Sequence, residues 1–124
     1  EFRRVLFRSN TISTDLHTGS MNGGMKDLLN VMSKFLNMGL NLSEVITSVT
    51  WDAAKSIKKE NLGNLSVGSI ADITILNLRE GDFGFIDTKN KKMNGTKKLE
   101  CELTIKDGKI VYDLNGLASL KWDE

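Results

Sequence analysis

The fold class of this chain is decided by residues 12–20, which read Ile-Ser-Thr-Asp-Leu-His-Thr-Gly-Ser. A short β-prone run from Thr11 to Thr14 predicts a strand that ends at the carboxylate of Asp15. An imidazole, His17, and a glycine-rich loop follow, and the pattern turns helical from Met25. Because (β/α) barrels place their chemistry where strands end and loops lead into helices, this order predicts an α/β fold with Asp15 at a functional site.

Two amphipathic helices are predicted after the loop. The first stops at Gly39, where a glycine favours a helix end. The second begins at Leu42, with Asn41 or Ser43 available as its N-cap, and continues to Lys59. Each helix carries an apolar stripe at helical spacing, so each must pack on an apolar surface, which in a barrel is the ring of strands.

After about residue 60 the pattern changes from helical to β. Residues 70–78 predict a nearly continuous apolar strand, residues 83–86 a shorter one, and residues 99–106 a half-buried strand with regular alternation. Residues 87–98 are rich in Lys and Asn, and we expect them to form a solvated loop or an irregular hairpin.

The last strand pair is predicted by its turn. Asp107-Gly108 is typical of a tight hairpin, and residues 109–112 would return as the partner strand. Cys101 lies on the apolar side of the preceding strand, so we expect an inert core thiol there and not a nucleophile.

The composition limits the classes of function. At 124 residues the chain has room for one domain or parts of two. A net charge of +1 gives no electrostatic case for nucleic acid or an anionic membrane, and no apolar run approaches membrane-spanning length, which predicts a soluble protein. The single cysteine fits a reducing, cytoplasmic location. The single histidine cannot supply the roughly three protein ligands of a hydrolytic zinc site.

Residues 1–9 are predicted to be foreign to the protein. Residues 3–9, Arg-Arg-Val-Leu-Phe-Arg-Ser, are what the sequencing-adaptor string AGACGTGTGCTCTTCCGATCT encodes in one reading frame. Their apolar core is too short for a secretory signal, which needs roughly seven residues. The few arginines would also make only a weak nucleic-acid arm. We therefore begin the fold at residue 10.

A second signature, residues 62–76, reads Leu-Gly-Asn-Leu-Ser-Val-Gly-Ser-Ile-Ala-Asp-Ile-Thr-Ile-Leu. Together with residues 12–20 it resembles the C-terminal end of the amidohydrolase superfamily of metal-dependent hydrolases, in the dihydroorotase-like amidohydrolase/deacetylase branch. Residues 68–72 resemble the family's Gly-x-x-Ala-Asp turn. Residues 50–55 resemble its Thr-x-Asn-Pro-Ala-Arg/Lys stretch, with Asp in place of Asn and Ala in place of Pro.

The resemblance covers the chain from residue 10 onward and implies two parts. Residues 10–60 would be the last strand and terminal helices of a (β/α)8 TIM barrel. Residues 61–124 would be the C-terminal part of a small composite β-sandwich domain. The implied activity is metal-dependent hydrolysis of amide, cyclic-amide or acyl-ester bonds in small acidic metabolites, with one or two Zn2+ ions.

The resemblance also implies roles for individual residues. Asp15 would bind the catalytic metal, take the proton of the attacking hydroxide and pass it to the leaving group. His17, Gly19 and Ser20 would face the substrate. The family's His-x-His pair, bridging carboxylated lysine and two later histidines are absent from this sequence. We therefore expect the isolated chain to be inactive and the remaining metal ligands to lie upstream of it.

The residue patterns alone leave other interpretations open. Asp15 is also typical of an Asx turn or a helix N-cap, and His17 of a hydrogen-bonded loop residue. The loop from Gly19 to Gly24 suits either an anion at a helix N-terminus or a flexible loop with a cap. The alternative functions are a small non-enzymatic α+β binding module and a deaminase- or dihydropyrimidinase-like member of the same superfamily. Whether the full-length enzyme is a homo-oligomer is also open.

Overall fold

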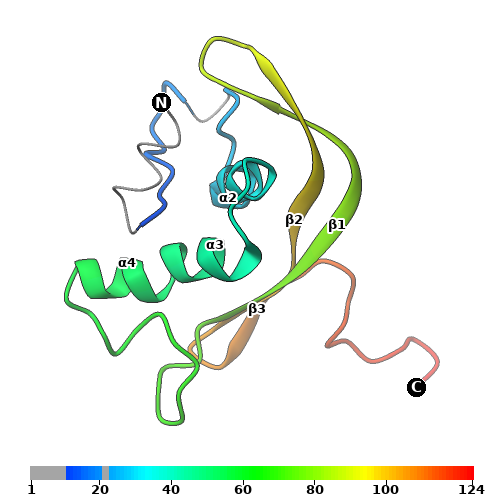
Figure 1. The fold of residues 1–124 in the computed structure, drawn as a ribbon. Helices are drawn as coiled ribbons and strands as arrows, with labels where there is room; N and C mark the ends of the chain where they lie inside the picture. Colours follow the sequence, from blue (N-terminus) through cyan, green and yellow to red (C-terminus); the bar gives the residue numbers. More distant parts are fainter. Residues whose placement is uncertain (1–10, 21–22) are drawn as a thin grey trace.

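The computed structural model describes residues 11–20 and 23–124, so the segment predicted to be foreign, residues 1–9, lies outside the described residues. Helices precede strands along the chain (Figure 1). The helices are α2 (Leu28–Asn37), α3 (Leu42–Val49) and α4 (Trp51–Ser56), and the strands are β1 (Ile73–Ile86), β2 (Lys92–Lys106) and β3 (Lys109–Asp113). The strands form one antiparallel sheet in the order β1-β2-β3. None of the helices in these described ranges has the length and apolar character that crossing a membrane requires.

Side-chain caps set where α2 and α3 begin. Asp27 is the N-cap of α2, and its carboxylate accepts the N–H of Asn30 at 2.8 Å. Asn41, one of the two predicted caps, forms a capping box with Glu44 at the start of α3. The predicted stop at Gly39 is confirmed, since this residue follows α2 with a φ of 111°. α2 itself begins after its cap, later than the apolar pattern predicts.

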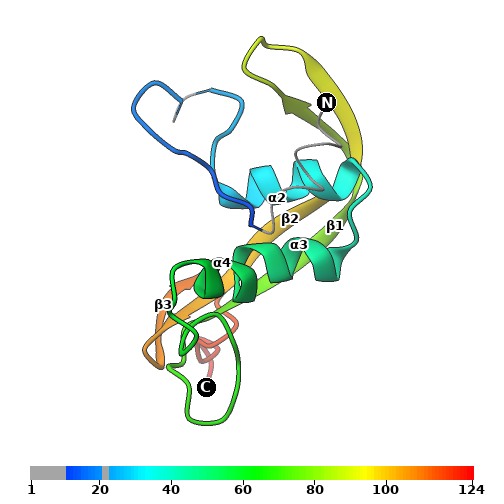
Figure 2. The same cartoon turned by 60° about the vertical axis from the view of Figure 1, so that its left-hand side comes forward.

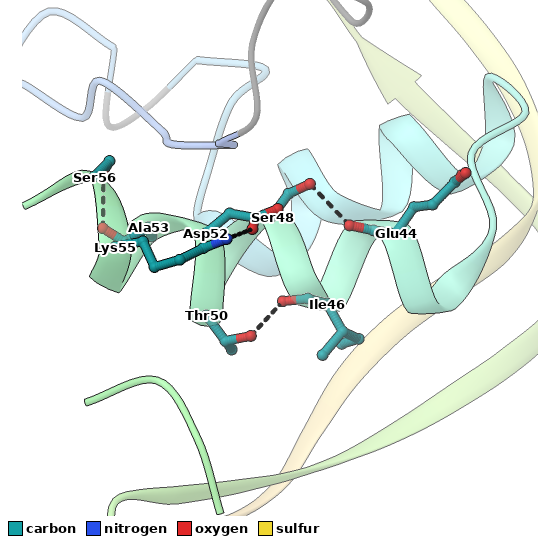
Figure 3. A network of polar contacts seen from close by, with 8 residues as sticks. All are labelled: Glu44, Ile46, Ser48, Thr50, Asp52, Ala53, Lys55 and Ser56. Carbon is teal, nitrogen blue, oxygen red and sulfur yellow. Dashed lines mark hydrogen bonds and ion pairs between the residues drawn. The ribbon is translucent and has the colours of Figure 1, made fainter. Parts of the chain in front are cut away.

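The second predicted helix is interrupted at Thr50, which corrects the continuous helix predicted to reach Lys59. The Thr50 hydroxyl donates to the carbonyl oxygen of Ile46 at 2.7 Å (Figure 3). Its backbone N–H donates instead to the carbonyl oxygen of Thr47 at 3.3 Å. A hydroxyl that takes the carbonyl four residues back competes with the helical hydrogen bond and bends the helix. α4 then begins at the next residue and ends at Ser56.

β1 and β2 form one long, curved hairpin, where separate short strands were predicted (Figure 1). Residues 92–98, predicted to belong to a solvated loop or an irregular hairpin, form the second of these and pair along residues 79–86. The register shifts between Glu80 and Phe83, and the turn around Asp87 joins the two strands. The Asp87 carboxylate accepts the N–H groups of Lys89 and Lys91, each at 2.8 Å. The lysine-rich composition indicates that the side chains are exposed. It does not prevent the backbone from pairing, because side chains project from the faces of a sheet while its hydrogen bonds lie in the plane.

A bulge interrupts β2. Leu76 pairs with Cys101, but its neighbour Ile75 pairs with Leu103, so Glu102 is an extra residue on this strand. An extra residue shifts every later side chain by one position relative to the partner strand. The regular alternation predicted for this strand is therefore broken at Glu102.

The hairpin predicted at Asp107-Gly108 is confirmed. Asp107 has a φ of 49° and Gly108 a φ of 76°, and two consecutive positive φ values are typical of the tight turns that join antiparallel strands. The family-like turn at residues 68–72 packs against this hairpin. The Asp72 carboxylate accepts the N–H of Asp107 at 2.8 Å, and the carbonyl oxygen of Ala71 accepts the N–H of Gly108 at 3.0 Å.

The hydrophobic core lies where α2 and α3 meet the sheet (Figure 2). Its buried members are Met32, Leu36, Val45 and Leu99. α2 lies against β2 within the curve of the hairpin, α3 lies against α2, and α4 continues from α3 away from the sheet (Figure 1, Figure 2). Burying a side chain of this size stabilises a fold by about 1.5–3 kcal/mol.

The predicted strand from residue 11 to 14 is extended but is not a strand, which is a correction. A strand needs a neighbour that completes its hydrogen bonds. The described residues place none there, and the N–H of Ile12 donates instead to the carbonyl oxygen of Ser48 at 3.3 Å. Residues 11–20 and 23–124 also contain one sheet only, without a second layer to complete a sandwich. The structure thus confirms a mixed α/β chain, and the barrel and sandwich stay predictions.

Candidate active site

Asp15 lies at the bend where the extended segment enters the loop. Its φ is 50°, a left-handed conformation that costs a non-glycine residue about 1–3 kcal/mol. The Thr14 hydroxyl oxygen accepts the N–H of Leu16 at 3.2 Å and holds the bend. Among the described residues, the exposed Asp15 carboxylate has no hydrogen-bond or ion-pair partner. It therefore acts neither in an Asx turn nor as the cap of α2, which is Asp27, and it is free to bind a ligand.

The His17 ring is folded back over its own loop. Its Nδ1 accepts the backbone N–H of Gly19 at 3.0 Å. An acceptor nitrogen carries no proton, so the neutral ring holds its proton on Nε2 and presents that N–H as a donor. Nδ1 is already engaged and is not free to bind a metal. That His17 faces the substrate stays a prediction.

Gly19 and Ser20 shape the position of this ring. A Cβ on Gly19 would lie 3.0 Å from Cε1 and 3.1 Å from Nδ1 of His17, so a side chain here would push the ring aside by a few tenths of an ångström. The Ser20 hydroxyl accepts the N–H of His17 at 3.2 Å and lies 3.3 Å from its carbonyl oxygen, to which it can donate. In this structure Gly19 and Ser20 position His17, and a direct contact of either with substrate stays a prediction.

Two side chains of α2 that the sequence does not single out hold the far end of the loop. Nδ2 of Asn30 donates to the carbonyl oxygens of Gly24 and Met25, each at 2.8 Å. Nζ of Lys34 donates to the carbonyl oxygen of Gly24 at 3.0 Å and to that of Ile86 at 2.8 Å. A polar residue on a helix carries no sequence signal for such a contact, because only the fold brings β1 to this loop.

The described residues do not assemble a complete metal site. Within residues 11–20 and 23–124, no three His, Cys, Asp or Glu side chains are grouped so that they could hold a metal ion. A hydrolytic zinc ion takes about three protein ligands, and the role of Asp15 as one of them stays a prediction. Cys101 is half-buried on β2, outside the buried core, with its Sγ 3.3 Å from the Thr104 hydroxyl, and its inertness stays a prediction.

These residues lie within the part of the chain that matches a known family. The model of the amidohydrolase family matches residues 8–111. This chain belongs to the amidohydrolase family. The resemblance drawn from residues 12–20 and 62–76 is thereby confirmed.

Two curated deacetylases are similar to this amidohydrolase chain. A deacetylase of Brucella anthropi is 42% identical over 78 residues, which are 63% of this chain and 19% of the relative. A deacetylase of Agrobacterium fabrum is 36% identical over 89 residues, which are 72% of this chain and 22% of the relative. The amidohydrolase chain thus spans about a fifth of the length of these relatives.

Solved structures of similar proteins share the fold. An adenine deaminase has a TM-score of 0.81 and 28% sequence identity, over 90% of this chain and 30% of its own. A dihydroorotase has a TM-score of 0.75 and 29% identity, over 83% of this chain and 28% of its own. Both the dihydroorotase-like branch and the deaminase alternative are therefore represented among the neighbours of this amidohydrolase chain.

Proposed function

We propose that this chain is the C-terminal part of a metal-dependent hydrolase that cleaves amide, cyclic-amide or acyl-ester bonds in small acidic metabolites. Family membership and the deacetylase relatives support this activity. The observation that carries the proposal is the exposed carboxylate of Asp15, which is unpaired within the described part of the chain, close in sequence to a His17 ring with Nδ1 already occupied. A free acid and a preset donor suit a hydrolytic site, and neither contributes to packing.

Asp15 would have two roles in this enzyme. Its carboxylate would contribute one ligand to a site for one or two zinc ions, whose other ligands come from outside this chain. Bound zinc would supply Lewis acidity toward water and the substrate carbonyl. Asp15 itself would accept the proton released by the attacking water and return it to the leaving group.

His17 would orient the substrate through its Nε2–H donor. A fixed donor suits a carboxylate, carbonyl or hydroxyl oxygen, which are the acceptors of small acidic metabolites. Gly19 leaves room for the ring, and Ser20 binds the backbone on either side of it, so both would act through His17. Since one carboxylate does not hold a hydrolytic metal, the chain by itself would not turn over substrate.

A metal assay tests the composition of the site. The purified chain is equilibrated with zinc, dialysed and analysed for bound metal at two pH values. Without a full ligand set we expect less than about a tenth of an ion per chain. Stoichiometric, tightly held zinc would mean that Asp15 and His17 belong to a site of this chain's own, and it would overturn the proposed division of ligands.

A substrate screen tests the reaction class. The enzyme extended upstream to the length of its relatives is assayed against N-acetylated amino acids, cyclic amides such as dihydroorotate, and adenine. The deaminase alternative is favoured by the adenine deaminase structure, and ammonia release from adenine would select it. Absence of turnover on every substrate would favour the non-enzymatic module. A cytoplasmic location and a homo-oligomeric parent enzyme stay predictions.

A further inference from the structure

Lys34 on α2 connects the loop just before this helix to the end of β1, which is 52 residues away in the sequence. From α2, its Nζ donates to the carbonyl oxygen of Gly24 at 3.0 Å and to that of Ile86, the last residue of β1, at 2.8 Å. Burial lowers the pKa of this half-buried ammonium, while the charge of Asp87 raises it and that of Lys26 lowers it further. Hydrogen bonds from a charged donor are stronger than those between neutral groups. The contact therefore links α2, the loop and β1.

Gly24 lies directly against Ile86. A Cβ added to Gly24 would overlap the carbonyl group of Ile86, so the missing side chain is what allows the loop to approach β1 this closely. Asn30 adds a second donor to the carbonyl oxygen of Gly24 at 2.8 Å, but its other bond stays within the loop. Within the described part of the chain, Lys34 is thus the side chain whose hydrogen bonds join this loop to β1.

Hydrogen bonds connect Gly24 to His17. The N–H of Gly23, the residue before Gly24, donates to the carbonyl oxygen of Ser20 at 3.0 Å. The N–H of Ser20 in turn donates to the carbonyl oxygen of His17 at 3.0 Å, and its hydroxyl accepts the N–H of His17. The position of Gly24 on β1 is therefore coupled to the backbone on both sides of the His17 ring.

We propose that Lys34 is a positioning residue, which holds the loop on β1 and so fixes the orientation of the His17 ring. This inference rests on the proposed role of His17 at the substrate. α2 stays on the sheet without Lys34, because Oδ1 of Asn37 accepts the N–H groups of Thr96 at 2.9 Å and Lys97 at 3.1 Å. Loss of the ammonium should therefore release the loop and leave the helix in place.

The single histidine of the chain makes a ring spectrum specific for this site. NMR of the ring nitrogens distinguishes a protonated nitrogen from an acceptor, so the wild-type chain at about pH 8, where an ordinary imidazole is neutral, should show one tautomer. In Lys34→Met we expect the ring to sample both tautomers, so that the difference between the chemical shifts of the two ring nitrogens becomes smaller. Lys34→Arg should restore it, since a guanidinium also donates to two acceptors. Lys26→Met, the control for loss of a charge, should leave it unchanged.

Wild-type ring signals in Lys34→Met, together with unchanged amide signals from β1 and β2, would overturn the proposal. Gly24→Ala is a second variant, which also serves if Lys34→Met loses the amide signals of β1 and β2. Its added methyl group separates the loop from β1 while Lys34 is still present. Ring signals of Gly24→Ala that match those of the wild type would therefore also overturn the proposal. The spectrum needs no metal, substrate or turnover. An inactive parent enzyme would thus count against the proposed function and not against the positioning by Lys34.

Discussion

The backbone N–H of Gly19 donates to Nδ1 of His17 at 3.0 Å, and a Cβ on Gly19 would also lie 3.0 Å from the same ring. The bond turns an exposed histidine into a donor of fixed polarity, two residues from the free carboxylate of Asp15. In the proposed hydrolase the two groups would act on different partners, the carboxylate on protons and metal, and Nε2–H on an oxygen of the substrate. The chemistry of the site then depends on backbone geometry as much as on side chains.

Gly19→Ala is expected to disturb this hydrogen bond. The added methyl group would lie 3.0 Å from the ring, so the ring must shift by a few tenths of an ångström and its hydrogen bond weakens. In the extended enzyme we expect kcat/KM to fall about 10-fold, which corresponds to roughly 1.4 kcal/mol of lost binding in the transition state. Gly84→Ala is the matched control, because its methyl group would meet only the flexible side chain of Lys92. Equal losses in both variants would contradict the prediction.

Asp15→Asn should abolish most of the activity of the extended enzyme. An amide neither accepts the proton nor carries the charge of the carboxylate, so kcat should fall about 100- to 10,000-fold. Asp27→Asn is the control, since Asn caps a helix about as well as Asp and the capping bond to Asn30 can persist. Steady-state kinetics on both variants test this role. If kcat of Asp15→Asn stays within twofold of wild type, Asp15 takes no part in the chemical step.

Ser33→Ala should destabilise the attachment of α2 to β2. Ser33 is 0% exposed, and its hydroxyl accepts the N–H of Leu99 at 2.9 Å while it donates to the carbonyl oxygen of Leu29 at 2.7 Å. Removing it leaves a buried N–H without a partner, which costs about 1–3 kcal/mol of the free energy of unfolding.

Urea unfolding followed by circular dichroism measures this loss. Ser56→Ala is the control, because the exposed Ser56 hydroxyl donates only to the carbonyl oxygen of Ala53 in its own helix (Figure 3). We expect that variant to stay within about 0.5 kcal/mol of wild type. A Ser33 variant as stable as the Ser56 variant would show that the Ser33 hydroxyl contributes nothing to holding α2 on β2.

The turn around Asp87 should loosen in acid. Hydrogen bonds from the N–H groups of Lys91 and Lys89 lower the pKa of the exposed Asp87 carboxyl below its usual 3.8. The folded turn therefore binds fewer protons than the unfolded chain, so the stabilisation is present above pH 3.8 and is lost as the pH falls through the folded pKa. The amide shifts of Lys89 and Lys91 should change together below pH 3.8. Asp87→Asn should abolish this transition, and its persistence would assign it to another group.

Predictions from the sequence succeed where the cause is local. The cap at Asn41, the helix stop at Gly39 and the Asp107-Gly108 turn each depend on a few neighbouring residues. The break at Thr50 also has a local cause. However, a threonine hydroxyl points to solvent in many helices, so the sequence pattern does not predict the hydrogen bond from Thr50 to Ile46.

Predictions fail where pairing over a distance decides. The composition of residues 92–98 left a loop and an irregular hairpin open, and they form a strand of a hairpin because residues 79–86 provide a backbone partner. Residues 11–14 have the reverse problem, since their β-prone side chains have no neighbouring strand within the described part of the chain. In both cases hydrogen bonding between distant segments outweighs local preference.

The sequence by itself determined the family, because the signatures at residues 12–20 and 62–76 resemble those of the amidohydrolase superfamily, but it left open whether Asp15 is paired. Only the tertiary structure decided which His17 nitrogen carries the proton and which side chain holds the loop. Lys34 and Ile86 are 52 residues apart, and their contact exists because α2 packs within the curve of the β1–β2 hairpin. A hydrogen bond requires two groups within about 3 Å, and over such a separation only the packing of the core brings them there.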